Sequence, residues 1–191
     1  MRLFIAVEID DPARRVAEAT AEALRRAIGP APNIRWVPAE NMHLTVRFIG
    51  NVVDNRAAVL LDALIPPLEI APFDIDLGGC GVFPPSRGAP RVIWMGLTAG
   101  LPNLAAMHDE FDRRLAPFGF EPERRAFSAH LTLARIKDAP GGVRAAVQPA
   151  IRDVTAVSTR CHITRATVFQ SHLSPRGPRY EAIAIAMLTR C

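Results

Sequence analysis

Two short stretches of the sequence share one pattern, HLTV at residues 43–46 and HLTL at residues 130–133. Each consists of histidine, leucine, threonine and a second aliphatic residue, and the two are separated by a little under half the chain length. In a β-strand, successive side chains point to opposite faces. Histidine and threonine would then share one face, while the aliphatic residues enter a core. We therefore expect two strands, one in each half of the molecule, that each present an imidazole beside a hydroxyl group.

The sequence around these stretches alternates between strand-like and helix-like patterns. Strands are predicted at residues 2–9, 34–37, 42–49, 73–83, 91–97, 130–136, 161–169 and 180–188, the stretch 73–83 being interrupted by glycines. Helices are predicted at residues 12–28, 54–64, 101–115 and 143–151. Helices interleaved with strands that hairpin-like connections join predict an α+β fold with antiparallel or mixed sheets. No linker rich in proline and serine divides the chain, so we expect two lobes that share one interface.

Composition excludes several classes of protein. With 191 residues, 49% of them hydrophobic and 22% charged, the chain can bury a core, which argues against intrinsic disorder. No apolar run approaches the ~18 residues that a membrane-spanning helix needs. The first ten residues already include acidic side chains and no cleavage site, unlike a secretory signal. We expect a cytoplasmic protein.

Charge and cysteine content exclude fewer classes of protein. The net charge is +4, and the basic residues are 22 arginines and the single lysine Lys137. Guanidinium groups match phosphate oxygens well, although a GC-rich genome would explain the arginines equally. The cysteines Cys80, Cys161 and Cys191 are odd in number, far apart and without a CxxC spacing. Free thiols are expected, with neither a disulfide framework nor a zinc site.

The paired imidazoles suit the cleavage of a phosphodiester. A neutral histidine accepts a proton from water and a protonated histidine donates one to the departing alkoxide, because the pKa of imidazole lies near neutral pH. The hydroxyl groups of Thr45 and Thr132 would hold the non-bridging phosphoryl oxygens. This chemistry requires neither a metal ion nor another cofactor. A third triplet, His162-Ile163-Thr164, also lies in a strand-like stretch, and spacing alone leaves it open as a candidate.

Longer blocks around the two patterns resemble a known superfamily. Residues 35–50 (RWVPAENMHLTVRFIG) resemble the first signature of the 2H phosphoesterases, and residues 127–135 (FSAHLTLAR) resemble the second. Residues 1–7 (MRLFIAV) and 169–180 (FQSHLSPRGPRY) are also typical. Within the superfamily the sequence is most similar to the RNA 2′,3′-cyclic phosphodiesterases, also called 2′-5′ RNA ligase-like proteins. The resemblance places His162 outside both signatures.

The resemblance implies a specific fold. Residues 1–191 are expected to form a single bilobal α+β domain, with two pseudo-symmetric lobes. Each lobe would contain an antiparallel sheet and flanking helices, and an active-site cleft would lie between the sheets.

It also implies an activity, the metal-independent hydrolysis of a 2′,3′-cyclic phosphate at an RNA end to a 2′-phosphomonoester. His43 would donate a proton to the leaving O3′ and His130 would activate water, while Thr45, Thr132 and Arg135 would bind the phosphate. A weak reverse reaction would form 2′-5′ linkages. The expected partner is RNA that ends in a cyclic phosphate; we expect a monomer with neither a membrane nor an obligate protein partner.

Other readings of the same residues differ in substrate or in class. A related enzyme would act on small cyclic nucleotides or on 2′-5′ oligoadenylate, with the same two histidines. A non-catalytic RNA-binding protein would use the arginine-rich surface and would have no need of two imidazoles.

Two arginines follow the patterns, and strand alternation predicts opposite directions for their side chains. Arg135 lies five residues after His130, so strict alternation would direct it away from the imidazole. A phosphate-binding role therefore needs a β-bulge or a contribution from a neighbouring edge. Arg47 shares the face of His43 by alternation, but an arginine at a strand end is expected to be solvated.

Other polar and aromatic residues have weaker claims. His172 and Arg176 lie in or beside a loop rich in proline and glycine, where substrate contacts often arise. His108 lies on the charged side of a helix and is expected to be solvated. Trp36 and Trp94 are expected to belong to the core rather than to stack on a base.

Overall fold

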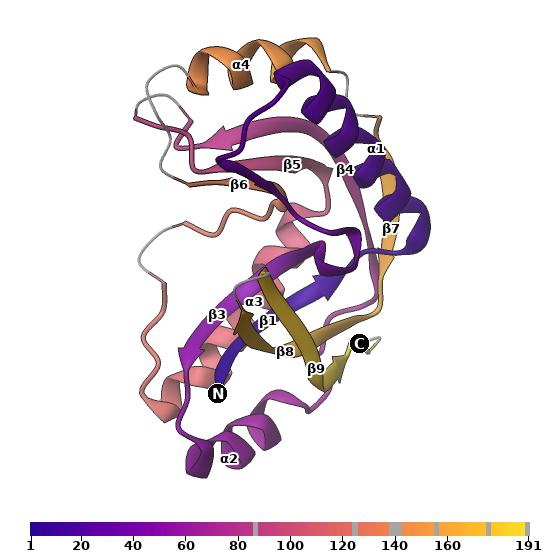
Figure 1. The fold of residues 1–191 in the computed structure, drawn as a ribbon. Coiled ribbons are helices and arrows are strands. Elements are labelled where there is room, and N and C mark those ends of the chain that lie inside the picture. The colour runs from indigo at the N-terminus through magenta and orange to yellow at the C-terminus, as the bar shows by residue number, and fades with distance from the viewer. Residues whose placement is uncertain (86–87, 124–125, 138–142, 155–156, 175–176, 190–191) are drawn as a thin grey trace.

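The computed structural model describes residues 1–85, 88–123, 126–137, 143–154, 157–174 and 177–189 (Figure 1). The predicted helices and strands are present, with one correction: the single strand predicted at residues 161–169 is two strands, because the chain leaves one part of the sheet after Ile163 and enters another at Arg165. The helices are α1 (Asp11–Ile28), α2 (Asp54–Leu64), α3 (Leu101–Leu115) and α4 (Val143–Asp153), with short 3₁₀ helices η1 (Ala39–Asn41) and η2 (Ala116–Phe118). The strands are β1 (Arg2–Glu8), β2 (Ile34–Trp36), β3 (His43–Asn51), β4 (Phe73–Phe83), β5 (Val92–Ala99), β6 (Leu131–Ile136), β7 (Thr159–Ile163), β8 (Arg165–Ser174) and β9 (Gly177–Met187). The α+β class is confirmed.

Helix α1 shows how local sequence defines an element. The Asp10 side chain accepts a hydrogen bond of 2.9 Å from the Ala13 amide and so caps the helix, with Pro12 in the first turn. Gly29 ends the helix with a positive φ of 77°, which glycine adopts without steric cost. The buried side of α1 consists of small residues and Leu24. Small side chains allow a helix to approach its neighbours closely.

The strands form one antiparallel sheet in the order β7-β4-β5-β6-β3-β1-β8-β9. The short strand β2 pairs with β6 on the edge opposite β5, the same edge that pairs with β3. Its two halves, β7-β4-β5-β6 and β3-β1-β8-β9, meet where β3 pairs with β6 through a single residue pair, Leu44 with Leu131. The two expected antiparallel sheets are thus joined at their edges into one curled sheet. The joint lies at the two HLT stretches.

Helices cover one face of each half. In Figure 1, α1 and α4 lie over the half that contains β4, β5 and β6, whereas α2 and α3 lie beside the half that contains β1 and β3. The predicted apolar stripe of α3 is confirmed as core, because Leu104, Met107 and Phe111 are all fully buried. Burial of each such side chain contributes about 1.5–3 kcal/mol. Among the described residues, no helix is long and apolar enough to cross a membrane.

Candidate active site

The pairing of β3 with β6 brings the two HLT stretches side by side. Leu44 and Leu131 lie opposite each other and are fully buried. Opposed residues of antiparallel strands point to the same face, and their neighbours in sequence point to the other face. The neighbours here are His43, Thr45, His130 and Thr132, all of which are partly exposed. We call the face that they share the inner face; the helices cover the opposite one.

Both imidazoles are oriented by the same backbone contact. The Nδ1 atom of His43 lies 2.8 Å from the carbonyl oxygen of Asn41, and Nδ1 of His130 lies 2.8 Å from that of Ser128. A carbonyl oxygen only accepts hydrogen bonds, so Nδ1 must carry the hydrogen and donate it. In the neutral ring this leaves the lone pair on Nε2. Each imidazole therefore exchanges protons through Nε2.

Burial favours the neutral form of both rings. It lowers the pKa of His43 from 6.5 to about 4, against the opposing effect of the hydrogen bond to Asn41. Burial likewise lowers the pKa of His130. The positive charge of Arg135 lowers the pKa of both rings further, whereas Glu8 acts in the opposite direction on His43. Both imidazoles are consequently uncharged near neutral pH in the unliganded protein.

A β-bulge turns Arg135 toward the imidazoles. The pairing of β5 with β6 shifts register between Ile93 and Trp94, so that Leu133 is an extra residue in β6. The extra residue reverses the alternation after it and places Arg135 on the same face as Thr132. Arg135 is exposed, and its guanidinium has no hydrogen-bond or ion-pair partner in the described part of the chain. The first of the two routes expected for this residue is the one observed.

A bulge in β3 has the opposite effect on Arg47. The pairing of β1 with β3 shifts register so that Val46 is the extra residue, and Arg47 lies opposite the buried Ile5. Arg47 is only 6% exposed and pairs with Asp112 and, at 3.2 Å, with Glu123. The expectation that Arg47 is solvated and shares the face of His43 is wrong, because the bulge turns it to the helix-covered face.

The packing of α3 on β3 also corrects the prediction for His108. This residue is 5% exposed, and its Nδ1 donates a hydrogen bond of 2.8 Å to the carbonyl oxygen of Val46, the bulged residue. Its Nε2 lies 3.4 Å from Asp112, and its ring stacks on Phe127. His108 is therefore buried rather than solvated, because its side of α3 packs on the bulge of β3. The i, i+4 spacing of His108 and Asp112 was the signal in the sequence for such a polar pair.

Aromatic rings that sequence patterns did not single out surround both histidines. The ring of His43 lies 5.0 Å from Phe4 and 5.2 Å from Tyr180, which it meets edge to face at 87°. The ring of His130 lies 4.9 Å from Phe83, also edge to face. These rings come from β1, β9 and β4, so only the tertiary fold brings them to the histidines. They provide the apolar surroundings that lower both pKa values.

The two tryptophans differ in position. Trp36 packs against the core as expected. Trp94 pairs with Thr132 and therefore lies on the inner face, where its indole covers Gly81 so closely that a Cβ atom there would lie 2.3 Å from the ring. The prediction that Trp94 belongs to the core is wrong. Glycines in β4 and β5 leave room for the indole to lie flat on the sheet.

The remaining polar candidates lie away from the two imidazoles. His162 is on β7, at the far edge of the sheet, and pairs with Asp74 at 2.7 Å. His172 pairs with Glu181 at 2.9 Å, and alternation along β8 and β9 puts this pair on the face opposite to Tyr180. Arg176 lies outside the described residues, as does Cys191. Cys80 and Cys161 are free thiols.

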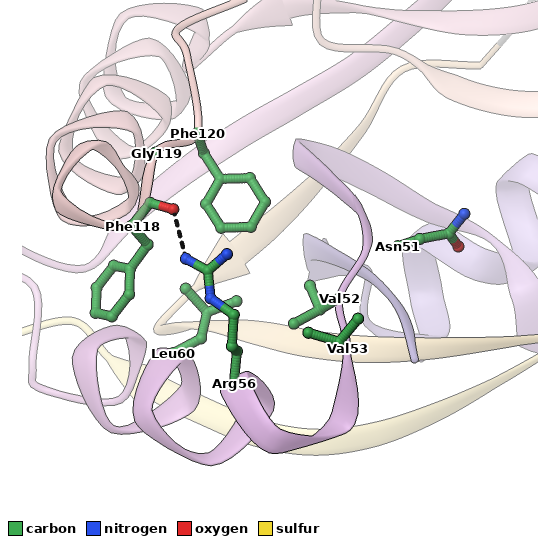
Figure 2. A pocket seen from close by; sticks show the side chains of 8 residues that line it. All are labelled: Asn51, Val52, Val53, Arg56, Leu60, Phe118, Gly119 and Phe120. Carbon is green, nitrogen blue, oxygen red and sulfur yellow. Dashed lines mark hydrogen bonds between the residues drawn. The ribbon is translucent and has the colours of Figure 1, made fainter.

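A cavity of about 210 Å³ lies at the other end of β3, where the strand leads into α2. Figure 2 shows Arg56 reaching between Phe118 and Phe120, with its guanidinium donating a hydrogen bond of 2.8 Å to the Phe118 carbonyl oxygen. Val52, Val53 and Leu60 also line the cavity. The cavity contains neither histidine of the HLT stretches.

Comparisons with known proteins find relatives of similar sequence and a solved structure of similar fold. The family model described as LigT-like phosphoesterase matches residues 7–94 and 98–180, and each stretch contains one HLT pattern. An RNA 2′,3′-cyclic phosphodiesterase of Aeropyrum pernix is 36% identical over 152 residues, covering 78% of this chain and 84% of the relative. One of Archaeoglobus fulgidus is 30% identical over 186 residues, covering 97% and 99%. A crystal structure from Thermus thermophilus superposes with a TM-score of 0.74 at 23% identity, covering 98% of this chain and 97% of that one.

Proposed function

The chain belongs to the LigT-like phosphoesterase family, and from that membership we propose that it hydrolyses 2′,3′-cyclic phosphates at RNA ends to 2′-phosphomonoesters. The observation that carries the proposal is the pairing of Leu44 with Leu131, which sets His43 and His130 on one face of the sheet. The activity named for the relatives of Aeropyrum pernix and Archaeoglobus fulgidus supports the choice of substrate. Both imidazoles come from one chain, so a monomer suffices.

Each histidine has one proton to move. Nε2 of His130 takes a proton from water as the water oxygen forms its bond to phosphorus. Nε2 of His43 gives a proton to O3′ as the bond between phosphorus and O3′ breaks. The phosphate stays on O2′, and exchange with solvent resets both rings. The common Nδ1 contact with a backbone carbonyl supports these roles, because it aims Nε2 of each ring away from the strand.

The low pKa of His43 makes substrate binding part of the mechanism. A donor must be protonated, yet burial lowers the pKa of His43 to about 4 in the unliganded protein. An anionic phosphate beside the ring favours the charged imidazolium and raises this pKa. We therefore propose that His43 acquires its proton with the substrate.

Thr45, Thr132 and Arg135 would hold the non-bridging phosphoryl oxygens. Neither threonine hydroxyl has a hydrogen-bond partner within the described ranges, and the Arg135 guanidinium is exposed beside both imidazoles. Donors fixed in advance stabilise the charge that develops on these oxygens in the transition state. The mechanism uses no metal ion, and by microscopic reversibility the same groups would form 2′-5′ linkages weakly.

The test is an assay of the purified protein in a chelator, with an oligoribonucleotide that ends in a 2′,3′-cyclic phosphate. We expect release of a 2′-phosphate end, and loss of this activity in both His43→Ala and His130→Ala. His162→Ala is the matched control, because it removes the histidine of the third His-x-Thr triplet, which lies at the sheet edge. Turnover that stops in the chelator, or that survives either active-site change at a near wild-type rate, contradicts the proposal.

A further inference from the structure

The two halves of the site place different residues at equivalent positions. Each strand contains a bulge three residues after its histidine, at Val46 in β3 and at Leu133 in β6. Each bulge turns the residue five positions after the histidine onto the inner face. That residue is Arg135 in β6 and Phe48 in β3. A cation on one side of the imidazoles thus corresponds to an aromatic ring on the other.

The ring of Phe48 is unusually accessible for its type. It is 54% exposed, and it is the one aromatic residue among the large hydrophobic side chains that are exposed in the described part of the chain. By contrast, Phe4, its partner across β1 and β3, is 3% exposed. The difference leaves Phe48 free to stack with a ligand.

Phe48 is also connected to the imidazole by ring contacts. The ring of Phe4 lies 5.0 Å from His43 and 6.1 Å from Phe48, so it separates the two. A nucleotide held at His43 would therefore lie beside Phe4 on the inner face. Phe48 lies one ring farther along this face, where the next nucleotide of an RNA chain would follow.

A positive charge accompanies this ring. Arg2 alternates with Phe4 along β1 and therefore lies on the inner face, beside the end of β3. Arg2 is exposed, and its guanidinium has no hydrogen-bond or ion-pair partner within the ranges described. An aromatic platform beside an unpaired arginine is the combination that binds single-stranded nucleic acid. An apolar surface of a protein partner would leave the Arg2 guanidinium without a counter-charge.

We infer, on the basis of the proposed function, that Phe48 stacks with the nucleobase of the nucleotide immediately 5′ to the one that carries the cyclic phosphate. Arg135 on β6 receives the terminal phosphate, and the RNA then crosses the inner face over β3 and β1. Because every base has an aromatic face, this contact selects for a second nucleotide rather than for a particular base. The enzyme therefore prefers an RNA end over a cyclic mononucleotide.

The experiment compares three substrates with one variant and one control. The substrates are adenosine 2′,3′-cyclic phosphate, the dinucleotide ApA with the same cyclic end, and that dinucleotide without its 5′ base. Phe48→Ala should lower kcat/KM on the dinucleotide about tenfold, mostly through KM, since stacking binds substrate and transition state alike. Its kcat/KM on the mononucleotide should stay within about twofold of wild type. Val59→Ala, at an equally exposed position on α2, should change neither value.

The substrate without its 5′ base makes the test specific. Wild type should lose about tenfold on it, and Phe48→Ala should lose nothing more, because the partner of the ring is already absent. Phe48→Trp should retain wild-type activity on all three substrates. An equal loss on mononucleotide and dinucleotide, or no loss on either, overturns the inference. A wild-type protein that opens no cyclic phosphate at all contradicts the proposed function instead, so the two failures are distinguishable.

Discussion

The two halves of the sheet present the same backbone devices with different side chains. In both, a histidine donates through Nδ1 to the carbonyl two residues before it, and a bulge follows three residues after it. The two residues after the bulged one are Arg47 and Phe48 in β3, and Ala134 and Arg135 in β6. One arginine is buried against α3 and the other is exposed beside the imidazoles. The comparison teaches that the repeat sets an imidazole from each half on one face, whereas departures from the repeat give Arg47 an ion pair with α3 and leave Arg135 and Phe48 exposed on that face.

The largest effect is expected from the feature that the halves share. Replacing either histidine by alanine removes one of the two proton transfers, so kcat should fall by about 10²–10⁴-fold in each variant. Steady-state kinetics on the cyclic-ended oligoribonucleotide measures the loss. A loss confined to one of the two variants would show that the halves are not chemically equivalent partners.

The next effect belongs to β3 alone and concerns stability. Arg47→Met leaves Asp112, whose side chain is only 14% exposed, without its guanidinium partner, and breaking a buried pair typically costs about 3–5 kcal/mol. Urea unfolding measures the free energy of unfolding. Arg135→Met is the matched change in β6 and should alter stability by no more than about 0.5 kcal/mol, because that side chain is exposed. Equal losses in the two variants would contradict the structural role assigned to Arg47.

The arginine of β6 should affect catalysis instead. Removal of one preformed donor to a developing oxyanion costs about 10²–10³-fold in kcat, which is the loss expected for Arg135→Met. The same change removes a positive charge that lowers the pKa of His43 and of His130. Both pKa values should therefore rise, as measured by proton NMR of the imidazole rings. A fall in either pKa would mean that Arg135 does not face the imidazoles.

The smallest effect follows from the deeper burial of His43. Its pKa is about 4 in the folded protein and 6.5 in the unfolded chain, so between these values the unfolded state binds the proton more strongly. Stability is therefore lost as the pH falls from about 6.5 to about 4, by up to about 1.4 kcal/mol per pH unit. His43→Asn should flatten that part of the curve of unfolding free energy against pH. A curve that stays parallel to wild type would show that His43 titrates normally.

How far the sequence predicts this molecule depends on the range over which each feature acts. Period-two alternation was enough to predict that His43 and Thr45 share a face, because only the local strand is involved. The same rule failed at Arg47, since the extra residue at Val46 reverses the faces that follow, until a second shift in register at Ile49. The burial of His108 requires α3 to pack on that bulge, a contact between segments distant in sequence. Exposure of Phe48 and the ring of Tyr180 beside His43 likewise arise only from the assembled sheet.

The central claim is that one phosphorus atom lies between Nε2 of His43 and Nε2 of His130. NMR of the imidazole nitrogens during titration with adenosine 2′-phosphate, in a chelator, tests it directly. Both Nε2 resonances should shift together with one dissociation constant and toward the protonated form, while both Nδ1 atoms keep their hydrogens. A response from only one ring, or two different dissociation constants, would contradict the claim.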